Sequence, residues 1–195
     1  MHYDNFKTAK DGEIEKVTVG LDLGIQGFRE SGNQEIRKKP QTYSLKVIIK
    51  DADGRVVKTI TKTVKPHQVS NQSQPSESAV RVASVLNKPH LWSPEDSYLY
   101  NVELRLQQGK KCVDGGMVRI GIRKVECKGK EGFWLNGKPY HKLIGGNRHQ
   151  DFAYVGNAVP NSQQWRDAKR LKDAGMCIVR AAHYPQDPAF MDACD

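Results

Sequence analysis

The sequence predicts a mainly β protein, in which an immunoglobulin-like β-sandwich is followed by a short β/α segment. Two observations predict this fold class. Between residues 17 and 122, apolar and polar residues alternate in one row after another, as they do in strands that bury one face. After residue 126 the pattern changes to a strand, a helix and a strand, which is the building unit of parallel sheets.

The alternating rows predict the strands of the sandwich. Short strands that follow one another at regular intervals, with turn residues between them, favour an immunoglobulin-like architecture. The apolar members of the rows, in chain order, are Val17, Val19, Leu21 and Leu23; Tyr43, Leu45, Val47 and Ile49; Val56, Ile60 and Val64; Val80 and Val82; Tyr98, Tyr100, Val102, Leu104 and Leu106; and Val118, Ile120 and Ile122.

Turn residues separate several of these rows. Residues 51–54 (DADG) and 114–116 (DGG) predict hairpin turns, and the Ser-, Gln- and Pro-rich stretch 67–78 predicts a long loop. A fibronectin-like adhesion module would show the same pattern, because the pattern indicates a fold class and not a function.

The strand, helix and strand of the last third are predicted in order. Residues 133–140 form a hairpin around an Asn-Gly turn, and Leu143 and Ile144 lead into a short strand that ends in glycines. Residues 161–162 (NS) cap a helix that Gly175 ends, and residues 177–179 form the second strand. The residues expected on one face of the helix are Trp165, Ala168, Leu171 and Ala174.

These patterns divide the chain into residues 1–125, the sandwich, and residues 126–195, an incomplete β/α domain. One strand–helix–strand unit neither closes a barrel nor completes an open parallel sheet, and the sequence ends inside what reads as a second helix. We therefore expect the chain to be a fragment of a larger protein.

Charge and hydropathy bound the class of partner. The net charge is +9 and the isoelectric point is near 9.4, a balance that is common in proteins that bind nucleic acid. The basic residues are nevertheless dispersed among apolar ones, as on the solvated face of a sheet, so we expect no nucleic-acid partner. No run of apolar residues is long enough to span a membrane, so we expect a soluble protein.

Two polar clusters follow the two strands of the last third. Residues 147–151 (NRHQD) follow the first strand and residues 180–185 (RAAHYP) follow the second. Because parallel strands end at the same edge of a sheet, the side chains of the two clusters converge there. Arg and His occur in both clusters, which favours a functional site over two unrelated loops.

An ordered set of motifs resembles glycoside hydrolase family 2, and in particular its bacterial β-galactosidases. Residues 91–94 (LWSP), 98–100 (YLY) and 121–126 (GIRKVE) are similar to the immunoglobulin-like domain of that family, and residues 133–139 (FWLNGKP) to its entry hairpin. Residues 147–149 (NRH) and 179–185 (VRAAHYP) resemble its barrel motifs. The resemblance covers residues 15–195 and implies that residues 126–195 are the start of a catalytic (β/α)8 (TIM) barrel.

The resemblance also implies roles for single residues. His149 and His183 match family histidines that bind sugar hydroxyls where the glycosidic bond is cleaved, and Arg180 matches an arginine that lies against the nucleophilic carboxylate. Arg148 and Asp151 either line this subsite or brace the rim of the barrel. Tyr184, together with the proline after it, is expected to form a turn that orients His183.

The family hydrolyses glycosides with retention, using one glutamate as acid/base and a second as nucleophile. The acid/base belongs to an Asn-Glu pair on a later strand, and this sequence contains no Asn-Glu pair. We therefore expect no catalytic residue in this chain and no hydrolytic activity of the chain alone. We also expect no metal site or cofactor here, although Mg²⁺ accompanies some family members, whose ligands would lie downstream.

The resemblance therefore predicts part of a retaining β-glycosidase, with β-galactosides as the preferred carbohydrate partner and a homo-oligomer as one assembly. β-Glucuronidases and β-mannosidases share the architecture and remain alternatives. A non-catalytic immunoglobulin-like interaction module is a further alternative, in which replacing His149 and His183 would have no effect.

Overall fold

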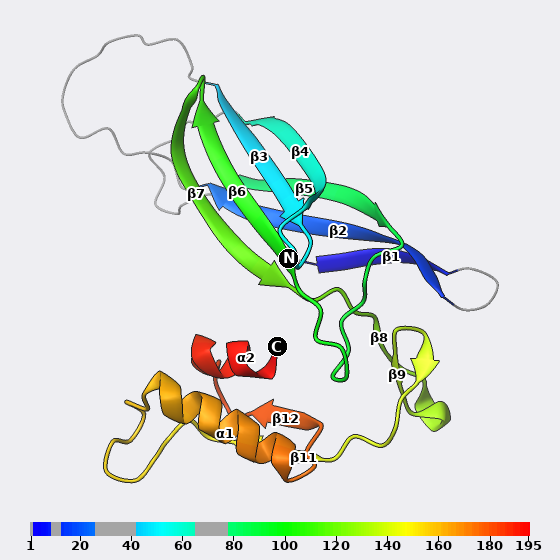
Figure 1. Cartoon of the computed structure of the whole chain (residues 1–195), viewed down its shortest axis with the longest axis vertical. Helices are drawn as coiled ribbons and strands as arrows, with labels where there is room; N and C mark the ends of the chain where they lie inside the picture. The colour runs from blue at the N-terminus through cyan, green and yellow to red at the C-terminus, as the bar shows by residue number, and fades with distance from the viewer. Residues whose placement is uncertain (1, 9–12, 26–41, 65–77) are drawn as a thin grey trace. The chain divides into compact units, whose positions relative to one another are not determined.

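The computed structural model describes residues 2–8, 13–25, 42–64 and 78–195, and these form two compact units (Figure 1). The first unit contains Met1–Leu91 and Tyr98–Arg123, and the second contains Trp92–Ser97 and Lys124–Asp195. The sequence pattern divides the chain between residues 125 and 126, close to the last of these borders. The pattern does not indicate that residues 92–97 belong with the second unit.

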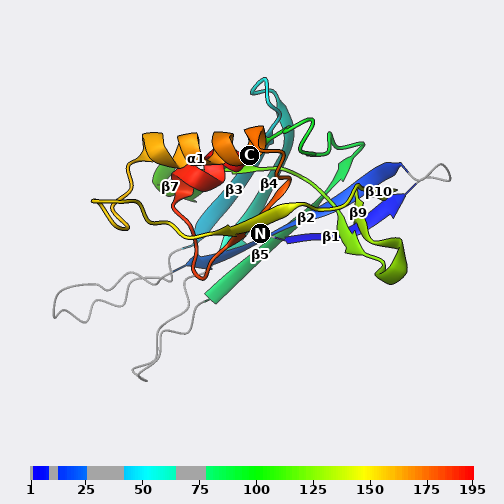
Figure 2. The same ribbon diagram turned by 90° about the horizontal axis from the view of Figure 1, so that it is seen from below.

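The first unit is built from two antiparallel sheets. One has the strand order β1-β2-β5, and Figure 2 shows these strands side by side; the other has the order β4-β3-β6-β7. The strands are β1 (His2–Thr8), β2 (Ile14–Ile25), β3 (Tyr43–Lys50), β4 (Val56–Val64), β5 (Ser78–Asn87), β6 (Tyr100–Gln108) and β7 (Lys111–Ile120).

One hydrophobic core joins the two sheets. It takes residues from both, among them Val17, Val19 and Leu21 of β2 and Val47 and Val102 of β3 and β6. In β2, β3 and β6 the residues that face the core are every second residue, as the alternating rows predict. The structure thus confirms the mainly β sandwich.

Three details of the sandwich differ from the sequence-based expectation. The row of β4, an edge strand, is largely exposed: Val56 is 59% exposed, Ile60 is partly buried against the core, and Val64 is the buried residue of the strand. β1 was not predicted, since its sequence HYDNFKT has no apolar alternation. Of the loop predicted at 67–78, only Ser78 lies within the described residues, where it begins β5.

One predicted turn is confirmed and the other is wrong. In the turn between β3 and β4, the amide of Gly54 donates to the carbonyl of Asp51 at 3.0 Å, and the φ of Gly54 is 81°. Residues 114–116 lie inside β7, and the chain turns earlier, at Gly109. Gly115 is a glycine because a Cβ there would stand 2.7 Å from the carbonyl oxygen of Leu104 on β6.

The second unit begins with a small antiparallel sheet of order β10-β9-β8. Its strands are β8 (Val125–Cys127), β9 (Phe133–Leu135) and β10 (Lys138–Pro139), with a short 3-10 helix at Gly129–Glu131. The predicted Asn-Gly turn joins β9 to β10, since Asn136 and Gly137 both have positive φ, of 53° and 80°. Asn136 also donates through Nδ2 to the carbonyl of Trp92 at 3.0 Å and so anchors residues 92–97.

The predicted strand–helix–strand follows. It consists of β11 (Gly145–Arg148), α1 (Asn161–Asp173) and β12 (Ile178–Ala181), and α2 (Pro188–Cys194) comes after it. β11 and β12 pair in parallel, as expected for such a unit. Among the residues that the structure describes, no helix combines the length and the hydropathy that crossing a membrane requires.

Helix α1 differs from the expectation at its start and on its buried face. Pro160 is the N-cap, and no side chain caps the helix, so residues 161–162 are helical residues and not caps. The buried residues of α1 are Gln163 and Gln164, whereas Trp165 is 53% exposed. The helix ends as predicted, with Gly175 at a φ of 80°.

We predict that Gly145→Ala disrupts the pairing of β11 with β12. A Cβ at Gly145 would stand 1.7 Å from the carbonyl oxygen of Ile178, so the strands would have to separate. We expect a loss of more than about 2 kcal/mol in the free energy of unfolding of the second unit, measured by urea denaturation. Gly146→Ala is the matched control, because a Cβ there has no neighbour within 4 Å. Equal losses in both variants would contradict the close approach.

We also predict a late-titrating tyrosine in the second unit. The hydroxyl of Tyr140 donates to Oε1 of Glu95 at 2.8 Å, and desolvation together with this hydrogen bond raises the pKa of Tyr140 to about 12. Because this pKa is raised in the folded state, the associated stability is present below pH ~10 and is lost as the pH rises through about 12.

Ultraviolet titration of the phenolate would measure the pKa of Tyr140, and Tyr140→Phe would identify its signal. In Glu95→Gln, the pKa of Tyr140 should fall toward its ordinary value. An unchanged pKa in that variant would contradict a contribution from Glu95.

Candidate functional site

The parallel register of β11 and β12 determines which side chains meet at the end of the two strands. Asn147 pairs with Arg180, Arg148 pairs with Ala181, and the amide of Ala182 donates to the carbonyl of Arg148 at 3.0 Å. The loops that follow the two strands therefore leave from the same edge. This is the convergence that the sequence predicts.

His149 and His183 lie side by side at this edge. Their ring centroids are 5.4 Å apart and their ring planes are inclined by 79°, an edge-to-face arrangement. Both side chains are exposed. The imidazoles of His149 and His183, which are 34 positions apart in the sequence, thus lie next to each other and are exposed to solvent.

Arg180 is exposed on the same edge and has Asn147 as its neighbour. Its Nη1 donates to Oδ1 of Asn147 over 3.5 Å, a long contact that their register makes possible. Asn147 stood in the sequence cluster but was not singled out as a site residue. The signal that could have found it is the strand register, which places it opposite Arg180.

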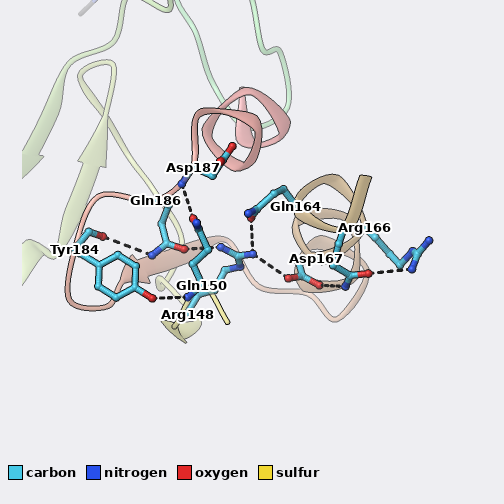
Figure 3. Close-up of polar contacts among 9 residues, drawn as sticks. Arg148, Gln150, Gln164, Arg166, Asp167, Tyr184, Gln186 and Asp187 are labelled. Carbon is cyan, nitrogen blue, oxygen red and sulfur yellow. Dashed lines mark hydrogen bonds and ion pairs between the residues drawn. The ribbon is translucent and has the colours of Figure 1, made fainter. Parts of the chain in front are cut away.

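Arg148 points the other way and is buried, with 8% of its surface exposed (Figure 3). Its guanidinium donates to Oε1 of Gln186, to Oε1 of Gln164 at 2.7 Å and to Oδ2 of Asp167 at 2.9 Å. The guanidinium also lies 4.0 Å from the centre of the Phe190 ring. These contacts connect β11 to α1, to α2 and to the loop after β12.

The network continues along α1. Oδ1 of Asp167 accepts from Nε2 of Gln163 at 2.7 Å, and Oε1 of Gln163 accepts from Arg166 at 2.9 Å. The side chain of Gln164 is fully buried, and its Nε2 is one of two buried side-chain atoms of the described residues that have no hydrogen-bond partner. Hydrophobic periodicity does not predict this network, because the buried face of α1 is formed by glutamines and not by apolar residues.

A second set of contacts links the two loops directly. The amide of Gln150 donates to the hydroxyl oxygen of Tyr184 at 3.0 Å, and the amide of Asp187 donates to Oε1 of Gln150 at 2.5 Å. Oδ1 of Asp187 in turn accepts from the amide of Ala189 at 2.8 Å, which caps α2. Figure 3 shows Gln150 between these two partners.

Asp151 is exposed at the start of the loop between β11 and α1. The residues after it form a tight turn, in which Phe152 and Gly156 exchange backbone hydrogen bonds of 3.0 and 2.9 Å. Of the five residues predicted to bind substrate, the structure thus brings His149, His183 and Arg180 to one exposed edge. It buries Arg148 behind that edge and leaves Asp151 on the adjoining loop.

The exposed edge offers hydrogen-bonding groups and positive charge, which suit a polyhydroxylated or anionic ligand. The glutamates of residues 124–195 are Glu126 and Glu131, and they lie on β8 and the 3-10 helix, not on the loops after β11 and β12. In the described part of the chain, no group of three or more His, Cys, Asp or Glu side chains is arranged to hold a metal ion.

Comparison with known proteins identifies relatives of both units. The family model "Glycosyl hydrolases family 2" matches residues 11–123, and the model "Glycosyl hydrolases family 2, TIM barrel domain" matches residues 125–195. A β-galactosidase of Thermoanaerobacter pseudethanolicus is 43% identical over 111 residues, which are 56% of this chain and 15% of that protein. A β-glucuronidase of Bacteroides fragilis is 35% identical over 114 residues, 57% of this chain and 16% of that protein.

The solved structures agree with the sequence relatives. A glycosyl hydrolase family 2 member from Bacteroides cellulosilyticus superposes with a TM-score of 0.77 at 28% identity, over 94% of this chain and 22% of that chain. The chain thus spans well under a quarter of the length of the first curated relatives that it matches, between 13% and 18% of each.

We predict that Arg148→Ala destabilises the second unit and that Arg180→Ala does not. Removing the buried guanidinium leaves its acceptors on Gln164, Gln186 and Asp167 without a donor, and we expect a loss of about 3 kcal/mol in the free energy of unfolding. Arg180 is exposed, and its replacement should cost less than about 0.5 kcal/mol. Urea denaturation of the two variants measures both values, and similar losses would contradict the bracing role of Arg148.

Proposed function

Because the chain belongs to family 2 of the glycosyl hydrolases, we propose that it forms the sandwich and the first barrel strands of a retaining β-glycosidase that prefers β-galactosides. The observation that carries the proposal is the exposed edge where β11 and β12 end. There, the ring centroids of His149 and His183 are 5.4 Å apart, and Arg180 is exposed on β12, the strand before His183. The relatives of this chain include a protein named β-galactosidase.

In this proposal, His149 and His183 bind hydroxyl groups of the sugar at the subsite of cleavage. Two imidazoles inclined by 79° present their ring nitrogens in different directions, which suits neighbouring hydroxyls on a chair-shaped ring. Hydrogen bonds to hydroxyls that strengthen in the transition state contribute several kcal/mol in glycosidases. Hydrogen bonds from the two histidines would therefore increase the rate of hydrolysis as well as the affinity for the sugar.

Arg180 would orient the nucleophilic carboxylate and stabilise its ionised form. A guanidinium beside a carboxylate lowers the pKa of that carboxylate and fixes its direction through charge-assisted hydrogen bonds. Asn147, which accepts from Nη1 of Arg180, would hold the guanidinium in place. Asp151 remains a proposed contact at the rim, and Arg148 is proposed to brace the rim from the buried side.

The family chemistry requires two glutamates, and neither glutamate of residues 124–195 lies on the loops after β11 and β12. In a retaining glycosidase one protonates the leaving oxygen and the other attacks the anomeric carbon, so the 195-residue chain alone should bind sugar at most weakly and hydrolyse nothing. Both carboxylates, any Mg²⁺ ligands and the contacts of a homo-oligomer would come from the remainder of the enzyme.

A β-glucuronidase is the second candidate, because curated relatives of that name match the chain nearly as well. The β-glucuronidase of Bacteroides fragilis is 35% identical over 114 residues. A glucuronide carries a carboxylate where a galactoside carries a hydroxymethyl group, so a positive charge near the sugar would favour the glucuronide. Direct comparison of the two substrates decides between these activities.

We predict that the complete enzyme hydrolyses aryl β-galactosides and that the 195-residue chain does not. A panel of chromogenic aryl β-galactoside, β-glucuronide and β-mannoside measures both. Cleavage of the glucuronide alone would move the assignment to β-glucuronidase. Failure of the complete enzyme to cleave any glycoside would sink the proposal and favour an interaction module.

In the active enzyme, we expect His149→Ala and His183→Ala to lower kcat/KM by about 100-fold or more. His141→Ala is the matched control, because His141 is an exposed histidine of the same unit, before β11, whose ring centroid lies 4.1 Å from that of Tyr140. Loss of activity in the control to the same extent would show that the effect is not specific to the exposed edge.

A further inference from the structure

The contacts between the two loops point to a role that lies beyond sugar binding. We propose that Gln150 and Tyr184 are positioning residues, which fasten the loop after β11 to the loop after β12 and thereby set the geometry of the His149 and His183 rings. The proposal rests on the proposed function, since the ring pair is the part of the site that the two residues would position.

Gln150 contacts the second loop through two separate groups. Its backbone amide donates to the hydroxyl oxygen of Tyr184 at 3.0 Å, and its side-chain Oε1 accepts from the amide of Asp187 at 2.5 Å. The two partners lie three positions apart on the second loop (Figure 3). Two hydrogen bonds from one residue to two points of a loop fix both the distance and the orientation of that loop.

The residues before and after His149 both form hydrogen bonds with the second loop. Arg148, before it, donates to Oε1 of Gln186, and Gln150, after it, contacts Tyr184 and Asp187. The backbone on either side of His149 is therefore bound to the loop that carries His183. Gln150 directly follows His149 and Tyr184 directly follows His183, so their hydrogen bond joins the neighbours of the two histidines.

The second loop has anchors of its own, so the connection is not between two free segments. Nε2 of Gln186 lies 3.5 Å from the carbonyl oxygen of Tyr184, and the same side chain accepts from the buried Arg148. Asp187 caps α2 by accepting from the amide of Ala189. Displacing either loop would break contacts with the helices as well as contacts between the loops.

The expected consequence for catalysis is larger than that for stability. The aromatic side chain of Tyr184 is 40% exposed, and water can replace its oxygen as acceptor for the amide of Gln150, so the loss of the hydroxyl should cost about 1 kcal/mol or less. A displacement of reacting groups by about 1 Å can, in contrast, cost about 100-fold in rate. A positioning role therefore predicts activity loss without unfolding.

The test uses Tyr184→Phe, Gln150→Ala and the double variant in the complete enzyme. Each single variant removes one of the two hydrogen bonds, because the amide of Gln150 remains in Gln150→Ala. We expect each to lower kcat for the aryl β-galactoside by about 10-fold with KM changed less than 3-fold, and the double variant to lose less than the product of both. Tyr154→Phe, at a fully exposed tyrosine of the same first loop, is the matched control and should have no effect.

Nuclear magnetic resonance of the histidine rings separates this proposal from the proposed function. The ring-proton shifts of His149 and His183 report their edge-to-face packing whether or not the enzyme turns over, and we expect both to move in Tyr184→Phe and not in Tyr154→Phe. Unchanged ring shifts in Tyr184→Phe would overturn the positioning role. A rise in KM in Tyr184→Phe that Gln150→Ala does not share would also overturn it, because Tyr184 would then contact the sugar directly.

Discussion

The parallel pairing of β11 with β12 is the constraint on which the candidate site depends. It sets Asn147 opposite Arg180 and carries both following loops to one edge, where the two histidines meet. Because side chains alternate along a strand, a slip of one residue would exchange the exposed and buried faces and turn Arg148 outward. The close approach at Gly145, where no Cβ fits against Ile178, allows this register.

The buried side chain of Arg148 connects the paired strands to the elements around them. A guanidinium removed from water requires acceptors for its donors, and Arg148 finds two amide oxygens and one carboxylate there. The carboxylate of Asp167 is partly exposed, at 26%, so the ion pair keeps part of its hydration. The acceptors come from α1 and from the loop after β12, and one side chain thus connects β11 to the helix after it and to the loop that carries His183.

Sequence patterns predicted the parts of this structure that depend on local periodicity and turn chemistry. The rows of β2, β3 and β6, the Asn-Gly turn at Asn136 and the parallel strand–helix–strand unit are confirmed. The turn expected at residues 114–116 was wrong, because Gly115 serves a close contact between strands and not a change of direction. The prediction for the face of α1 is wrong because the helix buries Gln163 and Gln164, and the hydrogen bond from Arg148 to Gln164 joins residues 16 positions apart, which no local pattern records.

A local sequence motif identifies the region of the candidate site, whereas the tertiary contacts of each residue determine where its side chain lies. A cluster such as residues 147–149 (NRH) groups neighbours that a sequence motif treats as one unit, yet the alternation of β11 separates Asn147 from Arg148 by a full strand face. Arg148 contacts α1 and α2, so its face is the one that the helices cover, and Asn147 with Arg180 occupies the opposite face. A motif of adjacent residues can therefore contain both an exposed polar group and a buried residue that connects the strand to the helices. Each residue's role follows from the face on which its side chain lies.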